Sequence, residues 1–193
     1  MARSFNDILG SQGDPALWGR DGELDTLATL LTREKPLIRF VQGLPGSGKS
    51  ALLRTFAERA RAAGAAVIEL DCRLLEPTPR GFLEELAGQQ DVEKASVEAV
   101  NGALAELSRR VVVILDTYEQ YRLLDTWLRE NFVPLLPANA RLLLASRQRF
   151  SPAWTARPPW HEFVEVMTLG PLDQTAAIDL LMRNGLGRDE ARR

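Results

Sequence analysis

Short apolar runs alternate with helical patterns along most of the chain. The runs predict five strands, over residues 37–42, 65–71, 111–115, 140–145 and 162–167. Apolar residues spaced three and four positions apart predict helices over about 21–33, 49–63, 80–87, 92–108, 119–131 and 172–184. The continuous β-branched run Val111 to Leu115 is typical of a strand covered on both faces. Five such alternations indicate an α/β fold with a parallel sheet between helices.

The first strand runs into the glycine-rich loop GLPGSGKS, residues 43–50. This loop matches G-x-x-x-x-G-K-[ST], the phosphate-binding P-loop. Glycines let the backbone wrap closely around an anion, and the following helix adds the positive end of its dipole. Lys49 would supply charge for the phosphates and Ser50 a hydroxyl for Mg²⁺. The predicted phosphate-binding residues are Gly43, Leu44, Pro45, Gly46, Ser47, Gly48, Lys49, Ser50 and Ala51.

Polar residues follow two later strands. Asp116 ends the third strand, at the sheet edge where ligands bind in α/β folds, and could hold Mg²⁺. Glu119 could orient a water for hydrolysis, or it could be an acid that favours a helix start. Ser146 and Arg147 follow the fourth strand, where the arginine could reach the γ-phosphate or remain a surface residue.

Other aromatic and reactive residues have less decided roles. Trp18, Gly19 and Arg20 could border a nucleotide base, although a hydrophobic staple at a helix start explains them better. The stiff loop between Trp154 and Trp160 either packs on the domain or forms a partner surface. We expect structural roles for Cys72 and His161, because neither has a metal-binding or catalytic partner nearby in sequence.

Composition limits the remaining choices. The 193 residues, 45% of them apolar, suffice for one domain and part of a second. The formal net charge of −2 gives no sign of a nucleic-acid or membrane surface. A single cysteine, with no signal peptide and no apolar run of membrane-spanning length, indicates a cytoplasmic protein.

Four segments together resemble the AAA+-related signalling ATPases of the STAND class, including their Orc1-like and LuxR-regulator types. In order they are WGRDGELDTLATLL, GLPGSGKS, VVVILDTYE and LLLASR, and the likeness extends over about residues 17–184. The resemblance implies a P-loop NTPase three-layer sandwich with strand order 5-1-4-3-2. It also implies that Asp116 is the Walker B acid, that Ser146 and Arg147 form sensor 1, and that Trp18, Gly19 and Arg20 lie near the base.

The resemblance further implies ATP or ADP with Mg²⁺, and a nucleotide-dependent switch within a larger protein. We expect a flexible lead-in over 1–15, an ATPase core over 16–170 and the start of a truncated helical lid over 171–193. Hydrolysis should be slow, because Thr117 stands where the family often has a second acid. A small-molecule kinase and a nucleotide-stabilised interaction module remain alternatives.

The expected partners are the nucleotide and further domains of the same protein, with self-association on activation left open. We expect neither membrane association nor direct nucleic-acid binding by this segment. The absence of N-K-x-D and L-S-G-G-Q-type motifs argues against a GTPase and a transporter ATPase.

Overall fold

The computed structural model describes residues 19–156, 158, 160–172 and 174–183. It forms two compact units, of which the larger is Gly22–Pro171 and the smaller combines both ends of the chain. The sheet and the sites discussed below all belong to the larger unit.

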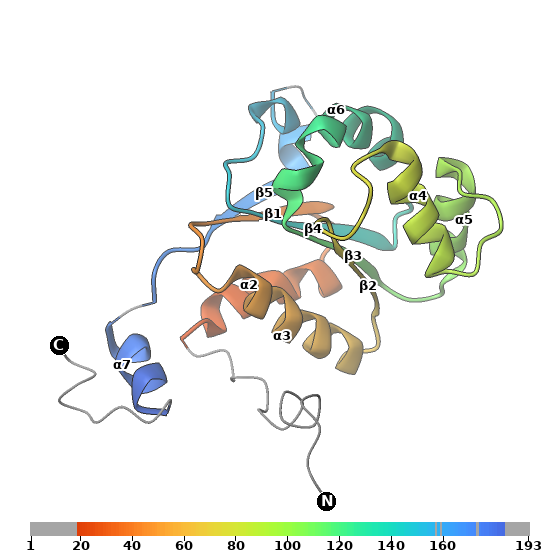
Figure 1. The fold of residues 1–193 in the computed structure, drawn as a ribbon. Helices are drawn as coiled ribbons and strands as arrows, with labels where there is room; N and C mark the ends of the chain where they lie inside the picture. Colours follow the sequence, from red (N-terminus) through yellow and green to blue (C-terminus); the bar gives the residue numbers. More distant parts are fainter. Residues whose placement is uncertain (1–18, 157, 159, 173, 184–193) are drawn as a thin grey trace, which may run out of the picture. The chain divides into compact units, whose positions relative to one another are not determined.

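A parallel five-stranded sheet forms the centre of the larger unit (Figure 1). The strand order is β2-β3-β4-β1-β5, which confirms the predicted order 5-1-4-3-2. All five predicted strands are present, with bounds that shift by at most two residues. They are β1 (Ile38–Gln42), β2 (Ala66–Asp71), β3 (Val111–Asp116), β4 (Ala140–Ser146) and β5 (Val164–Thr168).

Helices cover both faces of this sheet (Figure 1). One face carries α2 (Asp21–Thr32) and α3 (Lys49–Ala62), and the other carries α4 (Pro79–Gly88), α5 (Val97–Glu106) and α6 (Asp125–Trp127). The predicted three-layer arrangement is therefore present. None of the helices in the described ranges has the length and apolar character that crossing a bilayer demands.

The two-sided cover explains why the central strands β3 and β4 are buried at consecutive positions. Val111, Val113 and Leu115 are buried in a cluster with residues of α4 and α5, whereas Val112 and Ile114 are equally buried on the opposite face. Complete burial of one such side chain contributes about 1.5–3 kcal/mol. These buried strand side chains therefore contribute to the hydrophobic stabilisation of the larger unit.

Two predicted helices differ from those observed. The helix predicted over 92–108 begins only at Val97, because the Ser96 hydroxyl accepts a hydrogen bond from the Ala99 N–H at 3.2 Å and caps the helix there. The helix predicted over 119–131 is an irregular series instead. It consists of the 3₁₀ helix η1 (Tyr118–Leu124), the short α6, the π-helical turn η2 (Leu128–Phe132) and the 3₁₀ helix η3 (Val133–Leu135). The wide π turn precedes Pro134, whose missing N–H prevents regular helical continuation.

Two arginines inside the strands were not expected to be buried. Arg39 of β1 donates hydrogen bonds to the Thr26 carbonyl and to Glu165. Arg141 of β4 is surrounded by backbone carbonyls, including those of Arg33 and Glu34 at 3.0 and 2.8 Å. Burial lowers the pKa of Arg141 to about 10. Both cations fasten loops and helices to the sheet.

The two tryptophans of the Trp154–Trp160 loop pack on the domain, which favours the first of the two alternatives for this loop, whose residues 157 and 159 lie outside the described residues. Trp154, in the 3₁₀ turn η4 (Pro152–Trp154), is 0% exposed, and its ring lies 5.4 Å from that of Phe40. Its Nε1–H donates to Asp125 at 2.6 Å. Trp160, in the 3₁₀ turn η5 (Trp160–Glu162), packs edge-on against Trp154.

The smaller unit contains α7 (Gln174–Arg183), which begins two residues after the predicted start. Gly19 has φ +65°, and a Cβ atom at this position would lie 2.4 Å from the Ala176 Cβ. Only glycine therefore allows this contact. Residues 1–15 and 184–193 lie outside the described residues, so the predicted division into lead-in, core and lid stays a prediction.

Gly43 generates the first testable prediction. A Cβ atom at Gly43 would lie 2.6 Å from the Leu169 carbonyl oxygen and 2.9 Å from the Ser47 hydroxyl. We expect Gly43→Ala to lower the free energy of unfolding by about 1–3 kcal/mol, because backbone must move. Denaturant-induced unfolding measures this change.

Gly102→Ala in α5 is the control, since nothing lies within 4 Å of its new methyl group. It should leave stability unchanged or raise it by about 0.5–1 kcal/mol. Equal effects of the two substitutions would contradict the packing described.

Cys72 generates the second prediction. The thiol is buried, and this burial, followed by the nearby Asp71 carboxylate, raises its pKa to about 12. At about pH 8 the folded protein should therefore react with a thiol-specific disulfide reagent roughly a thousandfold more slowly than the unfolded chain. Absorbance of the released reagent follows the reaction, and concentrated guanidinium chloride gives the unfolded reference. Rapid labelling of the folded protein would show that Cys72 is accessible.

Candidate functional site

The P-loop joins β1 to α3 at the carboxyl edge of the sheet. Gly46 and Gly48 have φ values of +79° and +88°, in the left-handed region that favours glycine. Gly48 occupies the N-cap position of α3, where no side chain from the described residues caps the helix. The first-turn N–H groups are thus left to face an anion, together with the positive end of the helix dipole.

Lys49 is the buried cation of this loop, with 8% of its surface exposed. Its Nζ donates to the carbonyl oxygens of Gly43 and Leu44 at 2.7 and 2.9 Å, and more weakly to the Ser47 hydroxyl at 3.4 Å. Burial lowers the pKa of Lys49, the Glu119 carboxylate opposes this effect, and Arg147 adds to it. The ammonium group is therefore held inside the loop by carbonyl oxygens and by acidic neighbours.

Asp116 ends β3 beside the loop. Its Oδ1 accepts a hydrogen bond from the Thr117 N–H at 2.7 Å. Thr117 has φ +57° and is itself buried, so the chain turns sharply after the aspartate. This turn leads directly into η1, which carries Glu119.

Glu119 and Arg147 contact each other across neighbouring strand ends. The backbone N–H of Arg147 donates to Glu119 Oε2 at 3.1 Å, and the Arg147 Nε lies 3.4 Å from Oε1. The Glu119 side chain is 9% exposed, whereas that of Arg147 is 55% exposed. The sequence analysis named both residues but did not predict that Arg147 would contact the Glu119 carboxylate.

A cavity of about 240 Å³ brings the predicted residues together. It contains all four catalytic candidates, Lys49, Asp116, Glu119 and Arg147, and both predicted magnesium ligands, Ser50 and Asp116. The complete lining is Gly46, Gly48, Lys49, Ser50, Ala51, Arg73, Asp116, Thr117, Glu119 and Arg147. The pocket therefore combines helix N–H groups, three cations and two carboxylates.

Arg73 is a lining residue that the sequence analysis missed. It follows β2, and its guanidinium is oriented by Asp71, with Nη2 2.6 Å from Oδ2. Asp71 and Asp116 are register partners in adjacent strands. The sequence signal for this site was Asp71 at the end of the second strand. Its meaning became clear only once β2 was known to lie beside β3, which ends at Asp116.

Several predicted site residues do not line this cavity. Ser146 is buried, and its hydroxyl accepts a hydrogen bond from the Gln148 N–H at 3.0 Å. Gly43 and Ser47 form the loop around Lys49, and the side chains of Leu44 and Pro45 are exposed. Trp18 lies outside the described residues, and Gly19 and Arg20 belong to the smaller unit. Their predicted place near a base stays a prediction.

The donor set fits a magnesium nucleotide. In the described part of the chain, no three His, Cys, Asp or Glu side chains are grouped so that they could hold a metal ion by themselves. Magnesium is commonly held by one or two protein oxygens together with substrate phosphates. Ser50 and Asp116 offer such oxygens on the same cavity that the P-loop backbone borders.

Comparison with known proteins agrees with this geometry. The profile of the AAA ATPase domain family matches residues 16–151. The chain is 28% identical over 124 residues to the chaperone protein ClpB of Mycoplasma pneumoniae, and 26% identical over 121 residues to ClpB of Mycoplasma genitalium. Each match covers 62% of this chain but only 17% of the relative.

Solved structures share the fold at low sequence identity. The Aeropyrum pernix ORC1 protein in complex with DNA superposes with a TM-score of 0.60 and 23% identity, over 91% of this chain and 50% of that chain. Drosophila ORC bound to DNA gives 0.64 and 14%, over 90% and 47%. A component of the E. coli MS115-1 HORMA:CdnC:Trip13 complex gives 0.60 and 15%, over 99% and 76%.

These neighbours have the P-loop NTPase α/β fold that the strand order and the loop had indicated. The matched profile covers well over half of the chain and includes the P-loop and the strands that end at Asp116 and Ser146. The chain belongs to the AAA ATPase domain family.

Proposed function

We propose that this domain binds ATP and ADP with Mg²⁺, hydrolyses ATP slowly, and acts as a nucleotide-dependent switch of the STAND type within a larger protein. The observation that carries the proposal is the single cavity shared by Lys49, Asp116, Glu119 and Arg147 at the N-terminus of α3. Phosphoryl transfer depends on positioning and on charge stabilisation, and these four side chains already lie together on one cavity.

Each residue has a role that follows from its place. The N–H groups of the P-loop and the Lys49 ammonium would bind the β- and γ-phosphates, with the surrounding positions 43–51 shaping the loop. Ser50 and Asp116 would hold magnesium, which neutralises phosphate charge and orients the oxygens when it is bound. Glu119 would orient the attacking water and accept its proton.

Arg147 would position Glu119 as well as sense the γ-phosphate. Its main-chain N–H and its guanidinium both contact the carboxylate. A γ-phosphate competing for the guanidinium would change how Glu119 is held, since a phosphate carries more charge than one carboxylate. This competition supports a switch in which Arg147 reports the state of the nucleotide.

Slow turnover follows from two features. Thr117 occupies the position after Asp116 and supplies no second carboxylate, so Glu119 must act from the first turn of η1. The same Glu119 carboxylate lies 3.4 Å from the Arg147 guanidinium. A water-orienting group that is held by a cation before the substrate arrives must rearrange before it acts, which adds to the barrier.

Wider roles extend the proposal beyond the site. This chain spans about a sixth of the ClpB relatives and about half of the ORC chains, which supports a place for the domain among further domains of one protein. Two structural neighbours are bound to DNA. For this segment we propose no direct nucleic-acid contact, because its net charge is −2. A cytoplasmic location fits the single cysteine.

Phosphate release without an added acceptor tests the proposal. Asp116→Asn and Glu119→Gln should each lower kcat by about 10²–10⁴, because each removes a group that acts on the transferred phosphate or on the water. Arg147→Ala should also lower kcat, since the variant loses the guanidinium that we propose contacts the γ-phosphate, whereas the main-chain N–H of residue 147 still holds Glu119. Glu106→Gln, at an exposed position in α5, is the matched control and should leave the rate unchanged.

The mutant series also separates the assignments. If Glu119→Gln leaves hydrolysis unchanged while Asp116→Asn abolishes it, Glu119 does not orient the water. ADP release that depends on a small-molecule acceptor would instead identify a kinase. Nucleotide binding without any turnover would identify the interaction module.

A further inference from the structure

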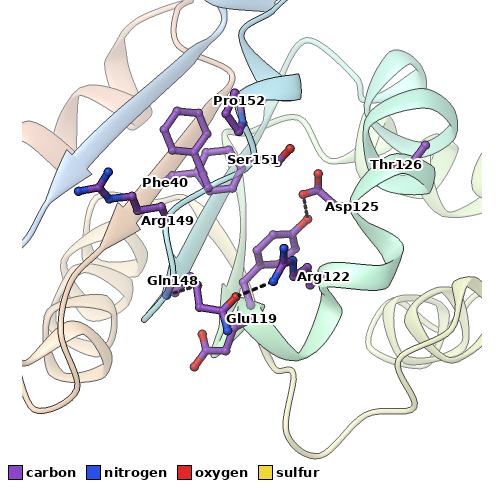
Figure 2. Close-up of a pocket in the computed structure, with 12 residues that line it drawn as sticks. Phe40, Glu119, Arg122, Asp125, Thr126, Gln148, Arg149, Ser151 and Pro152 are labelled. Atoms are coloured by element: carbon purple, nitrogen blue, oxygen red, sulfur yellow. Dashed lines mark hydrogen bonds between the residues drawn. The ribbon is translucent and has the colours of Figure 1, made fainter.

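A second cavity of about 460 Å³ lies beside Glu119 (Figure 2). It is bordered by η1, by α6, and by the end of β4 with the segment Gln148–Pro152 that follows it. Its size falls in the range of about 300–1,000 Å³ that is usual for small-molecule sites. The predicted nucleotide contacts leave this cavity unexplained, apart from Glu119 and Ser146, which line its wall.

Aromatic rings make up the apolar part of the wall. Phe40 lies 5.4 Å from Phe150 between ring centroids and 6.0 Å from Tyr118. The hydroxyl of Tyr118 donates to Asp125 Oδ1 at 2.8 Å, and Trp154 donates to the same oxygen. The hydrogen bond to Asp125 fixes the Tyr118 ring, and the buried Phe40 ring supports that of the half-buried Phe150, so the cavity offers a preformed apolar surface.

The charged side chains of the wall are unequally engaged. Both acids have partners, since Glu119 is held by Arg147 and Asp125 accepts two hydrogen bonds. In the part of the chain that the structure describes, the Arg122 side chain has only a long contact of 3.5 Å, to the Gln148 side chain (Figure 2). Within the described residues, Arg149 makes neither a hydrogen bond nor an ion pair. The two arginines are exposed, and their donors are available to an anion, whereas the two acids are already engaged.

We propose that this second cavity binds a small anion that carries an apolar ring, either a carboxylate or a phosphate monoester, and that the anion acts as an effector of the phosphate pocket. Arg122 and Arg149 would bind the anionic group while the rings of Phe40, Tyr118 and Phe150 pack on its body. The Arg149 side chain points away from Arg122 and Asp125 in Figure 2, so it must turn inward on binding.

Glu119 is the physical link between the two cavities, because it lines both of them. Gln148, which contacts Arg122, also follows directly after Arg147, whose N–H holds the Glu119 carboxylate. An anion that draws Arg122 away from Gln148 would therefore shift the segment that positions Glu119. This effector role rests on the proposed nucleotide function, whereas binding in the cavity does not.

Ligand-observed fluorine NMR tests the binding step with three probes of similar shape. We expect 4-fluorophenylacetate, 4-fluorophenyl phosphate or both to bind with a Kd below about 10 mM, and 4-fluorobenzylamine not to bind. The relative affinities of the two anions identify the anionic group. Arg122→Gln and Arg149→Gln should each weaken anion binding about tenfold, because each removes a charged hydrogen bond.

Two controls locate the site. Arg109→Gln, an exposed arginine that does not line the cavity, should leave the affinity unchanged. Lys49→Ala should also retain probe binding if the probe sits in the second cavity. A probe bound at the P-loop would instead lose affinity when the Lys49 charge is removed. Absence of binding by both anions, equal binding of the amine, or indifference to both arginine substitutions would overturn the proposal.

The effector step is measured by the Kd of a fluorescent ADP analogue with and without saturating probe. We expect a change of about fivefold or more, lost in Glu119→Gln, with the reciprocal change in probe affinity that linkage requires. Probe binding with an unchanged nucleotide Kd would remove the effector role. Failure of the analogue to bind even without probe would instead contradict the proposed nucleotide function.

Discussion

Burial of the Lys49 ammonium inside the loop that follows β1 is the constraint on which the site depends. A cation with 8% of its surface exposed must be compensated, and carbonyl oxygens at 2.7 and 2.9 Å together with the Glu119 and Asp116 carboxylates provide this compensation. The carbonyls are available only because the glycine-rich backbone curls around the amine. The carboxylates of Asp116 and Glu119 are available only because β3 ends near the loop.

The topology of the sheet supplies that neighbour. β4 lies between β1 and β3, so the strand ends of Gln42, Ser146 and Asp116 meet at one edge although they are distant in sequence. Gln42 and Ser146 are register partners, and the Gly43 N–H donates to the Ser146 carbonyl at 3.2 Å. The phosphate loop and the segment that carries Arg147 are thus joined by main chain.

Sequence reasoning predicted the parts of the fold that depend on local pattern. Continuous apolar runs located all five strands, and the spacing of Gly43, Gly48 and Lys49 located the loop. The pairing of Glu119 with Arg147 could not be predicted, because it joins residues 28 positions apart through strand adjacency. Arg73 was missed for the same reason. The helix predicted over 119–131 is already irregular in its first turns, Tyr118–Leu124, which are 3₁₀, and apolar spacing gave no signal of this. The cap at Ser96 shortened α5 by a hydroxyl contact that periodicity does not contain.

Direct binding of ATP and ADP with Mg²⁺, compared by calorimetry for the unaltered chain and for Lys49→Ala, tests the central claim. Loss of a charged hydrogen-bond donor to phosphate should weaken binding by about tenfold to a hundredfold. Thermal unfolding without nucleotide would first establish that the variant is folded. The account predicts that the unaltered chain binds both nucleotides and that the variant binds them much more weakly. Equal affinities, or no binding by the unaltered chain, would contradict it.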